Sequence, residues 1–380
     1  MSESGIPVNR NETPRVTAAD IVRFMDELAP PGLAFDGDRI GLQVGRMDRP
    51  VARVLVALDA YPAVIEEAVR IHADMLVTHH AMLFRPLTSI DTGSARGRAL
   101  ARAISADLAV FNAHTNLDIT EGGVNDVLAE MFDLQDVEIL ERTRNEQLRK
   151  LVVFVPHGSH AKVLDAVCAA GAGHIGAYSH CTFNTQGTGT FLPGEGTHPY
   201  IGRSGKLEQA DEVRLETIVP ERLVETVVRA MLEAHPYEEV AYDLYPLQLM
   251  GKASGIGRIG NLPEPTSLKT FAASVKDKLG LTHIRFSGEA DRIVKRVAVL
   301  GGSGGRYAGQ AIRKGADVLV TADCDHHTVA EAQHDGLSIV DATHAALEVP
   351  VLDKVADYLR ERTGIEVRVT TVAEDPFQWI

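Results

Sequence analysis

Apolar residues recur at two different spacings near the start of the chain, and each spacing predicts a different element. Thr17 and Asp20 have the spacing of a helix N-terminal cap, and apolar residues then recur at helical spacing until Pro30. Short apolar runs of the buried-strand type follow, separated by a helical stretch. These elements are a strand at residues 53–59, a helix at 62–72 and a strand at 75–78, in the order of a βαβ unit.

The C-terminal third of the chain repeats this order, with a strand at 296–302 and a helical stretch at 310–314. Arg53 aligns with Arg296, and residues 73–78 align with 316–321, at one constant offset without a gap. A second match joins residues 108–118 to 337–348, because each has an apolar run, then a histidine, then a carboxylate four residues later. Chance agreement of this kind is rare, so we predict two related α/β lobes.

Between the two lobes the pattern changes. A strand at 151–155 and a helix up to Ala170 are followed by a Gly/Thr-rich stretch, and then by two alternating strands that flank a helix. Those strands are at 212–216 and 240–244, and the helix is at 221–234. This β-α-β-β-α-β order predicts a ferredoxin-like α+β domain inserted into an α/β body. We therefore expect domains at residues 15–140, 148–249 and 250–380.

Composition and charge narrow the classes of partner. The chain has 380 residues and a formal charge of −14, which repels a phosphate backbone and argues against binding to nucleic-acid polymers, although a small anionic substrate remains possible. Neither a membrane span nor a signal peptide is indicated, because no apolar run approaches about 20 residues and the N-terminus is polar. We expect a cytoplasmic protein. Three irregularly spaced cysteines predict that any metal uses nitrogen and oxygen ligands.

Five residues form a candidate set of metal ligands. His79 and His80 directly follow a buried parallel strand, and Asp118 follows the next strand, so their side chains are expected at one edge of a sheet. His344 and Glu348 are spaced to share one face of a helix. Solvated loop histidines and an ordinary helix contact are the alternatives. The set suits two divalent ions among Zn, Fe, Mn, Co and Ni, bridged by a carboxylate.

Other polar residues are candidates for supporting roles. We expect His114 to orient Asp118, with a metal ligand or a buried loop histidine as alternatives. A glycine-rich turn between a strand and a helix could hold a phosphate, or could only pack the helix onto the strand. It consists of Gly301, Gly302, Ser303, Gly304 and the nearby Arg306. Candidates for proton transfer or substrate contact, with a solvated loop as the alternative, are Asp323, Asp325, His326 and His327.

Two His-Pro-Tyr motifs lie in the inserted segment. His235 begins one motif and His198 the other, and either could indicate a second metal site. Neither has partners at a diagnostic spacing. Structural turns are therefore the preferred interpretation.

Over nearly its whole length the chain resembles the GTP cyclohydrolase 1 type 2 homologue family, also called Nif-three-like dinuclear metal-centre hexameric proteins, and its insert resembles a PII/CutA-like domain. The resemblance implies a homohexamer with a two-metal site that uses the five residues above. The motifs that carry it are Asp38 to Gly45, Thr78-His79-His80, His114 to Asp118, Gly301 to Gly304, Thr321 to Asp323, His326-His327, His344 with Glu348, Gly187 to Phe191 and His235 to Tyr242.

These observations lead to a functional hypothesis. We expect a metal-dependent hydrolase in which two ions generate a hydroxide nucleophile. The family name implies GTP as the substrate, opened at the purine imidazole ring, with its triphosphate near the glycine-rich turn. A metallophosphatase is the alternative enzyme. A metal-storage, metal-delivery or regulatory protein is the alternative without catalysis.

Overall fold

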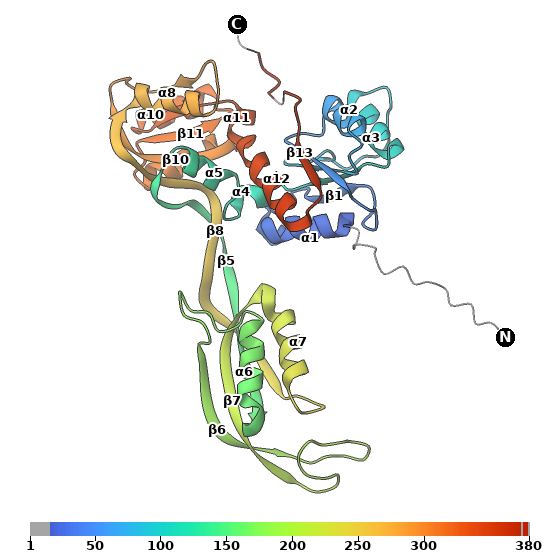
Figure 1. The fold of residues 1–380 in the computed structure, drawn as a ribbon. Helices are drawn as coiled ribbons and strands as arrows, with labels where there is room; N and C mark the ends of the chain where they lie inside the picture. Colours follow the sequence, from blue (N-terminus) through green and yellow to red (C-terminus); the bar gives the residue numbers. More distant parts are fainter. Residues whose placement is uncertain (1–15, 374, 379–380) are drawn as a thin grey trace, which may run out of the picture. The chain divides into compact units, whose positions relative to one another are not determined.

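The computed structural model describes residues 16–373 and 375–378 and shows two compact units (Figure 1). One unit contains the described residues up to Thr143 and from Ser254 onward, and the other contains Arg144–Ala253. The long strands β5 (Gln135–Pro156) and β8 (Tyr242–Ser267) run from one unit into the other. In the described residues no helix combines the length and the apolar composition needed to cross a bilayer.

The first lobe of the larger unit is built on a five-stranded sheet with the order β1-β4-β3-β2-β13. Its central strands are parallel, and β1 pairs antiparallel with β4. Alternating residues of β2 and β3 face opposite layers, since Leu55 and Leu76 pack against α2 and α3 while Val54 and Val77 face the other side. The elements are β1 (Gly41–Val44), β2 (Arg53–Ala57), α2 (Pro62–Arg70), β3 (Met75–Thr78), α3 (Ala95–Ser105), β4 (Ala109–Asn112) and β13 (Glu366–Val369).

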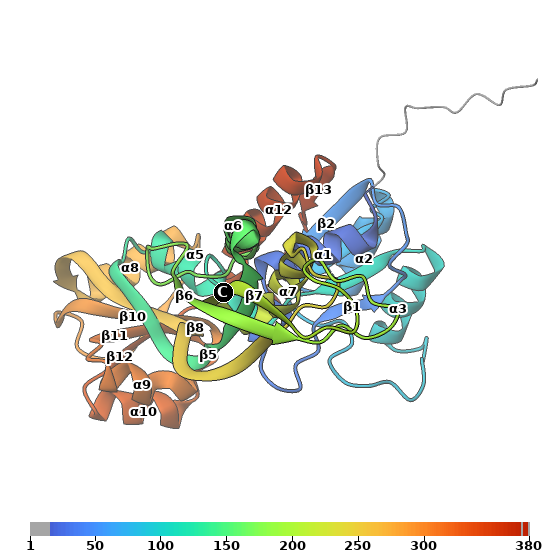
Figure 2. The same cartoon turned by 90° about the horizontal axis from the view of Figure 1, so that it is seen from below.

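The second lobe has the same plan. Its strands follow the order β8-β10-β11-β12-β9, with β10, β11 and β12 parallel and both edge strands antiparallel. In Figure 2, α9 and α10 lie on one side of these strands and α8 on the other. The elements are α8 (Leu268–Lys278), β9 (Arg285–Phe286), β10 (Ile293–Ser303), α9 (Ala308–Arg313), β11 (Val318–Ala322), α10 (His326–His334) and β12 (Ser338–Asp341).

Matching hydrogen bonds confirm that the two lobes are related. The Asp74 carboxylate accepts the N–H groups of residues 52 and 53, and the Asp317 carboxylate accepts those of residues 295 and 296. Arg53 donates to the carbonyl oxygen of residue 71, and Arg296 donates to that of residue 314. Equivalent aspartate and arginine side chains therefore make equivalent hydrogen bonds beside β2 in the first lobe and β10 in the second.

One hydrophobic core is shared by both lobes. It contains Val54 and Val77 of the first sheet, Val297 of the second, and apolar side chains of α1 and α12. The capping pair predicted for α1 is present, because Thr17 and Asp20 each accept the other's backbone N–H. The helices in this layer are α1 (Ala18–Leu28), the 3-10 turn η1 (Pro31–Leu33), α4 (Thr115–Ile119), α5 (Val124–Met131), α11 (His344–Glu348) and α12 (Pro350–Thr363).

The smaller unit has the predicted β-α-β-β-α-β order. Its strands are arranged as β6-β7-β5-β8, and β7 pairs antiparallel with both β5 and β6. Apolar side chains of both helices pack on one face of this ferredoxin-like sheet. Beyond the shared β5 and β8, the elements are the 3-10 turn η2 (His157–Ser159), α6 (His160–Ala169), β6 (Thr182–Phe191), β7 (Glu208–Pro220), the 3-10 turn η3 (Glu221–Leu223) and α7 (Val224–Ala234).

Candidate metal centre

The histidine pair lies at the carboxyl end of β3. The backbone N–H groups of His79 and His80 donate to the carbonyl oxygens of Ala57 and Leu58, which extends the pairing with β2 past the last residue of the strand. The centroids of the two imidazole rings lie 5.1 Å apart. They therefore occupy the edge where open α/β sheets bind their ligands.

Two short helices bring carboxylates to the same place. α4 begins after His114, and α11 begins at His344, where the Thr343 hydroxyl caps the helix by accepting a backbone N–H. Asp118 and Glu348 each lie four residues after a histidine, one helical turn along. Their exposed fractions are only 8% and 3%, so each carboxylate is directed into the protein.

Four imidazole rings lie in the cluster, namely those of His79, His80, His114 and His344. Each ring makes a hydrogen bond through its Nδ1 atom, which leaves its Nε2 atom free to bind a metal ion. Such partners set the ring orientation, and where the partner is a carbonyl oxygen Nδ1 must carry the proton. The partners are the Ala113 carbonyl oxygen for His79 (2.9 Å), Asp59 Oδ1 for His80 (3.1 Å), Asp38 Oδ1 for His114 (2.9 Å) and Asp323 Oδ2 for His344 (2.6 Å).

Glu348 is the centre of the cluster. Its Oε2 atom lies 3.1 Å from His80 Nε2 and 3.1 Å from His344 Nε2, and its Oε1 atom lies 3.7 Å from His79 Nε2. Asp118 Oδ1 lies 3.5 Å from the same His79 atom. One carboxylate thus faces three histidines that come from both lobes.

These ligand atoms form three overlapping groups that could each hold a metal ion, the atoms within a group lying within 4.8 Å of one another. His79 Nε2, Asp118 Oδ1 and Glu348 Oε2 are also buried without a hydrogen-bond partner. Leaving such atoms unsatisfied costs about 1–3 kcal/mol each, and a cation removes that cost. The groups are His79 with His80 and His114, His80 with His344 and Glu348, and His79 with Asp118 and Glu348.

The pKa shifts show how strongly this cluster attracts positive charge. Burial lowers the pKa of His80, but the hydrogen bond with Asp59 and the nearby Glu348 carboxylate outweigh burial and raise it to about 10. The Glu348 carboxylate, 3.1 Å from Nε2, raises the pKa of His344 to about 9. Burial favours a neutral Glu348, yet the neighbouring histidines hold its pKa well below its usual range. Protons on the imidazoles thus balance the carboxylates until a metal ion replaces them.

Gly302 makes room for the Glu348 carboxylate. A Cβ atom on Gly302 would lie 2.4 Å from Glu348 Oε1, and the residue has a φ of 63°, where side chains are strained. In the same turn, the N–H of Gly301 donates to Asn125 Oδ1 and the N–H of Gly304 donates to Thr321 Oγ1. The N–H groups of Gly301 and Gly304 are therefore already hydrogen-bonded within the protein, whereas Ser303 and Arg306 line a neighbouring cavity.

This cavity has a volume of about 440 Å³ and opens beside the cluster. Asp118, His344 and Glu348 form part of its wall. The Arg306 guanidinium stacks on the Tyr307 ring, 4.9 Å from its centroid, and also faces the Phe35 ring. A substrate in this cavity meets two aromatic rings and the Arg306 cation, and also the carboxylates of the lining, which are Asp118, Asp323, Asp325 and Glu348.

Some of the predicted site residues lie together in the ligand cluster, and others lie outside it. The five predicted ligands converge, and the His114 ring joins them at 5.3 Å from the His79 ring. Asp323 accepts a hydrogen bond from His344. His326 and His327 instead begin α10 in exposed positions, outside the three ligand groups.

Two carboxylates of this centre were not predicted. Asp59 holds His80, and Asp38 accepts hydrogen bonds from His114 and from both the backbone and the hydroxyl of Thr115. Asp59 lies two residues after the end of β2, so the rule that identified His79 could also have identified Asp59. Asp38 precedes β1 and had no signal beyond its place in the family motif.

Comparisons with known proteins find relatives over almost the whole chain. The model of a family described as Duf34/NIF3 (NGG1p interacting factor 3) matches residues 16–376. A Halalkalibacterium halodurans protein named "GTP cyclohydrolase 1 type 2 homolog" is 46% identical, covering 95% of this chain and 98% of that protein. A Bacillus subtilis protein of the same name is 42% identical over 96% of this chain and 99% of its own. The crystal structure of a Bacillus cereus protein related to NIF3 superposes with a TM-score of 0.90 at 42% identity, over 97% of this chain and 100% of that one.

Proposed function

Because the chain belongs to the Duf34/NIF3 family, we propose that it is a hydrolase that works with two divalent transition-metal ions. The observation that carries the proposal is the convergence of His79 Nε2, Asp118 Oδ1 and Glu348 Oε2, all buried and without hydrogen-bond partners. Neutral imidazole and carboxylate ligands suit Zn, Fe, Mn, Co and Ni. The donor set therefore fits the ions that the sequence predicts.

The residues divide naturally between two ions. His79 and Asp118 would hold one ion, His80 and His344 would hold the other, and Glu348 would bridge them because its two oxygens face opposite sides of the cluster. His114 lies close enough to His79 and His80 to add a further nitrogen. Such a pair supplies a water-derived nucleophile at neutral pH by lowering the pKa of bound water.

The protein itself would position the ligands and the substrate. Asp59 and Asp323 hold the rings of His80 and His344 through their Nδ1 atoms. The cavity beside the cluster admits a substrate, and Arg306 supplies a positive charge for an anionic group. We propose a nucleotide substrate, with GTP opened at its imidazole ring as the first candidate, because relatives are named after GTP cyclohydrolase.

A phosphoesterase is the second candidate, because a two-metal centre and Arg306 serve a phosphate equally well. The cavity favours either hydrolase over a storage or delivery protein, since storage needs no space for a substrate beside the ions.

The test is to load the protein in turn with Mn, Fe, Co and Zn and to assay GTP and p-nitrophenyl phosphate. We expect about two ions per chain and turnover in at least one metal form. Glu348→Gln should lose both metal and activity, whereas His326→Ala, which changes an exposed histidine outside the ligand groups, should keep both. Full metal loading without turnover of any nucleotide or phosphoester would refute the hydrolase and support metal storage or delivery.

A further inference from the structure

A second cavity lies wholly within the unit Arg144–Ala253. It has a volume of about 550 Å³ and is lined by β6, β7 and the segments 193–201 and 237–241. That volume suits an organic molecule and is far too large for a bare ion. None of the groups of possible metal ligands in the described residues includes a residue of this unit, so the ligands of the metal centre do not explain the cavity.

Aromatic rings form one wall of this cavity. The Tyr237 ring is flanked by the Tyr200 ring, with 6.0 Å between centroids, and by the Phe191 ring, with 6.4 Å between centroids. His235 packs edge-on against Tyr237, which fixes the ring in place. Tyr200 remains 62% exposed, so its ring is available for contact.

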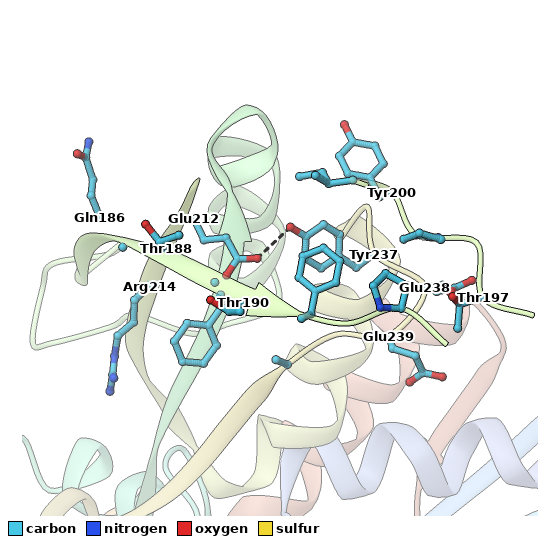
Figure 3. A pocket seen from close by; sticks show the side chains of 18 of the residues that line it. Gln186, Thr188, Thr190, Thr197, Tyr200, Glu212, Arg214, Tyr237, Glu238 and Glu239 are labelled. Carbon is cyan, nitrogen blue, oxygen red and sulfur yellow. Dashed lines mark hydrogen bonds between the residues drawn. The ribbon is translucent and has the colours of Figure 1, made fainter. Parts of the chain in front are cut away.

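A carboxylate is buried at the same wall. Glu212 is only 8% exposed, and its Oε1 atom accepts a hydrogen bond from the Tyr237 hydroxyl (2.9 Å), as Figure 3 shows. A Cβ atom on Gly189 would lie 2.2 Å from Glu212 Oε2, so the glycine leaves the space that this carboxylate occupies. Burial and the contact with Glu212 raise the pKa of Tyr237, which keeps the phenol a proton donor. One neutral donor is little compensation for a buried carboxylate.

The other charged groups make the cavity negative. Glu238 and Glu239 also line it. Among the described residues of the lining, Arg214 is the only basic side chain, and it donates to Glu216 (2.7 Å) and points away from Glu212 in Figure 3. Glu212 and Glu238 each accept one hydrogen bond from a neutral donor, but no basic side chain of the described lining pairs with them. An anionic ligand would therefore face negative carboxylates, whereas a cation would meet carboxylates and aromatic rings.

We propose that this cavity binds a small organic cation, namely an amine or a guanidinium compound with an apolar body. The cationic group would lie between the Glu212 carboxylate and the rings of Tyr237 and Tyr200, where charge attraction and cation–π attraction act together. The apolar body would fill the space along Phe191 and Ile201. The inserted unit would then be a ligand-binding domain with its own specificity.

The test compares three probes of similar size and different charge, namely benzylammonium, benzyl alcohol and benzoate, by calorimetry on the full chain at pH 7.5. We expect benzylammonium to bind about tenfold more tightly than benzyl alcohol, and benzoate to bind least. Equal binding of the amine and the alcohol, or preference for benzoate, would overturn the proposal.

A variant series assigns the binding to Glu212. Glu212→Gln keeps the shape and can still accept the Tyr237 hydrogen bond, so we expect about tenfold weaker benzylammonium binding with unchanged circular dichroism and metal content. Glu225→Gln removes an exposed carboxylate outside the cavity and should bind as the wild type does. If Glu212→Gln misfolds, Tyr237→Ala, which removes the central ring, replaces it in the series. Unaltered benzylammonium binding in the folded variant would refute the assignment.

Discussion

Replacing Gly302 by alanine should disturb the metal centre without unfolding the protein. Gly302 is near the end of β10, at a φ of 63°, and a Cβ atom there would lie 2.4 Å from Glu348 Oε1 and 3.2 Å from His344 Nε2. The atoms that it meets are the ends of two side chains. The carboxylate would therefore turn away from its present position while the backbone keeps its path.

Two separate effects contribute to the magnitude. The positive φ costs about 1–2 kcal/mol of unfolding free energy for any residue with a Cβ atom. Displacing Glu348 moves the carboxylate that faces His79, His80 and His344, and we expect metal affinity to fall by at least about tenfold. Gly315→Ala is the matched control, because Gly315 has a φ of 73° but no atom within 4 Å of its Cβ position.

Urea denaturation of the metal-free proteins measures the loss of unfolding free energy, and titration with zinc against a competing chelator measures the loss of metal affinity. We expect both variants to lose similar stability and Gly302→Ala alone to lose affinity. Wild-type zinc affinity in Gly302→Ala would show that Glu348 is not a ligand and would refute the proposed centre.

Four further predictions follow from the same structure. Since the pKa values of His80 and His344 are raised to about 10 and 9, metal uptake at pH 7 should release protons and metal affinity should rise with pH up to about pH 10. Calorimetry in buffers of different ionisation enthalpy counts the released protons, and metal uptake without proton release would contradict this prediction. Asp59→Asn should weaken zinc binding about 10–100-fold in the same chelator titration, because the ring of His80 loses its anionic partner. Asp126→Ala should cost about 3–5 kcal/mol in urea denaturation, because it leaves the guanidinium of Arg258, which is 6% exposed, without its carboxylate; a smaller loss would mean that water compensates the charge. The family resemblance predicts six copies of the 41.1 kDa chain, and light scattering that gives a dimer or a monomer would contradict it.

Some features of this protein could be predicted from the sequence because their causes are local or repeated. The cap of α1 depends on Thr17 and Asp20, which are three residues apart, and the structure contains both of the expected hydrogen bonds. The duplicated lobes were visible because Arg53 of β2 and Arg296 of β10 occupy equivalent positions and make the same hydrogen bonds. Position after a parallel strand identified the His79-His80 pair, since strands of one sheet end at one edge.

Other features were decided only by tertiary structure. Asp38 holds His114 across 76 positions of the chain, and no periodicity connects the two residues. His326 and His327 follow a parallel strand as His79 and His80 do, but Asp325 caps α10 and both rings stay exposed. The cavity of the smaller unit forms only because β6 and β7 pair, which brings Gly189 against Glu212.

The distinction has a physical reason. Hydrogen bonds of a cap, the period of an amphipathic strand and the repetition of a lobe are short-range properties, so neighbouring residues encode them. The direction of a side chain and its burial depend on packing between distant segments. The sequence therefore determined which residues are available for metal chemistry, including the pair His344 and Glu348 on one helix, and packing of the two lobes brought Glu348 to His79 and His80.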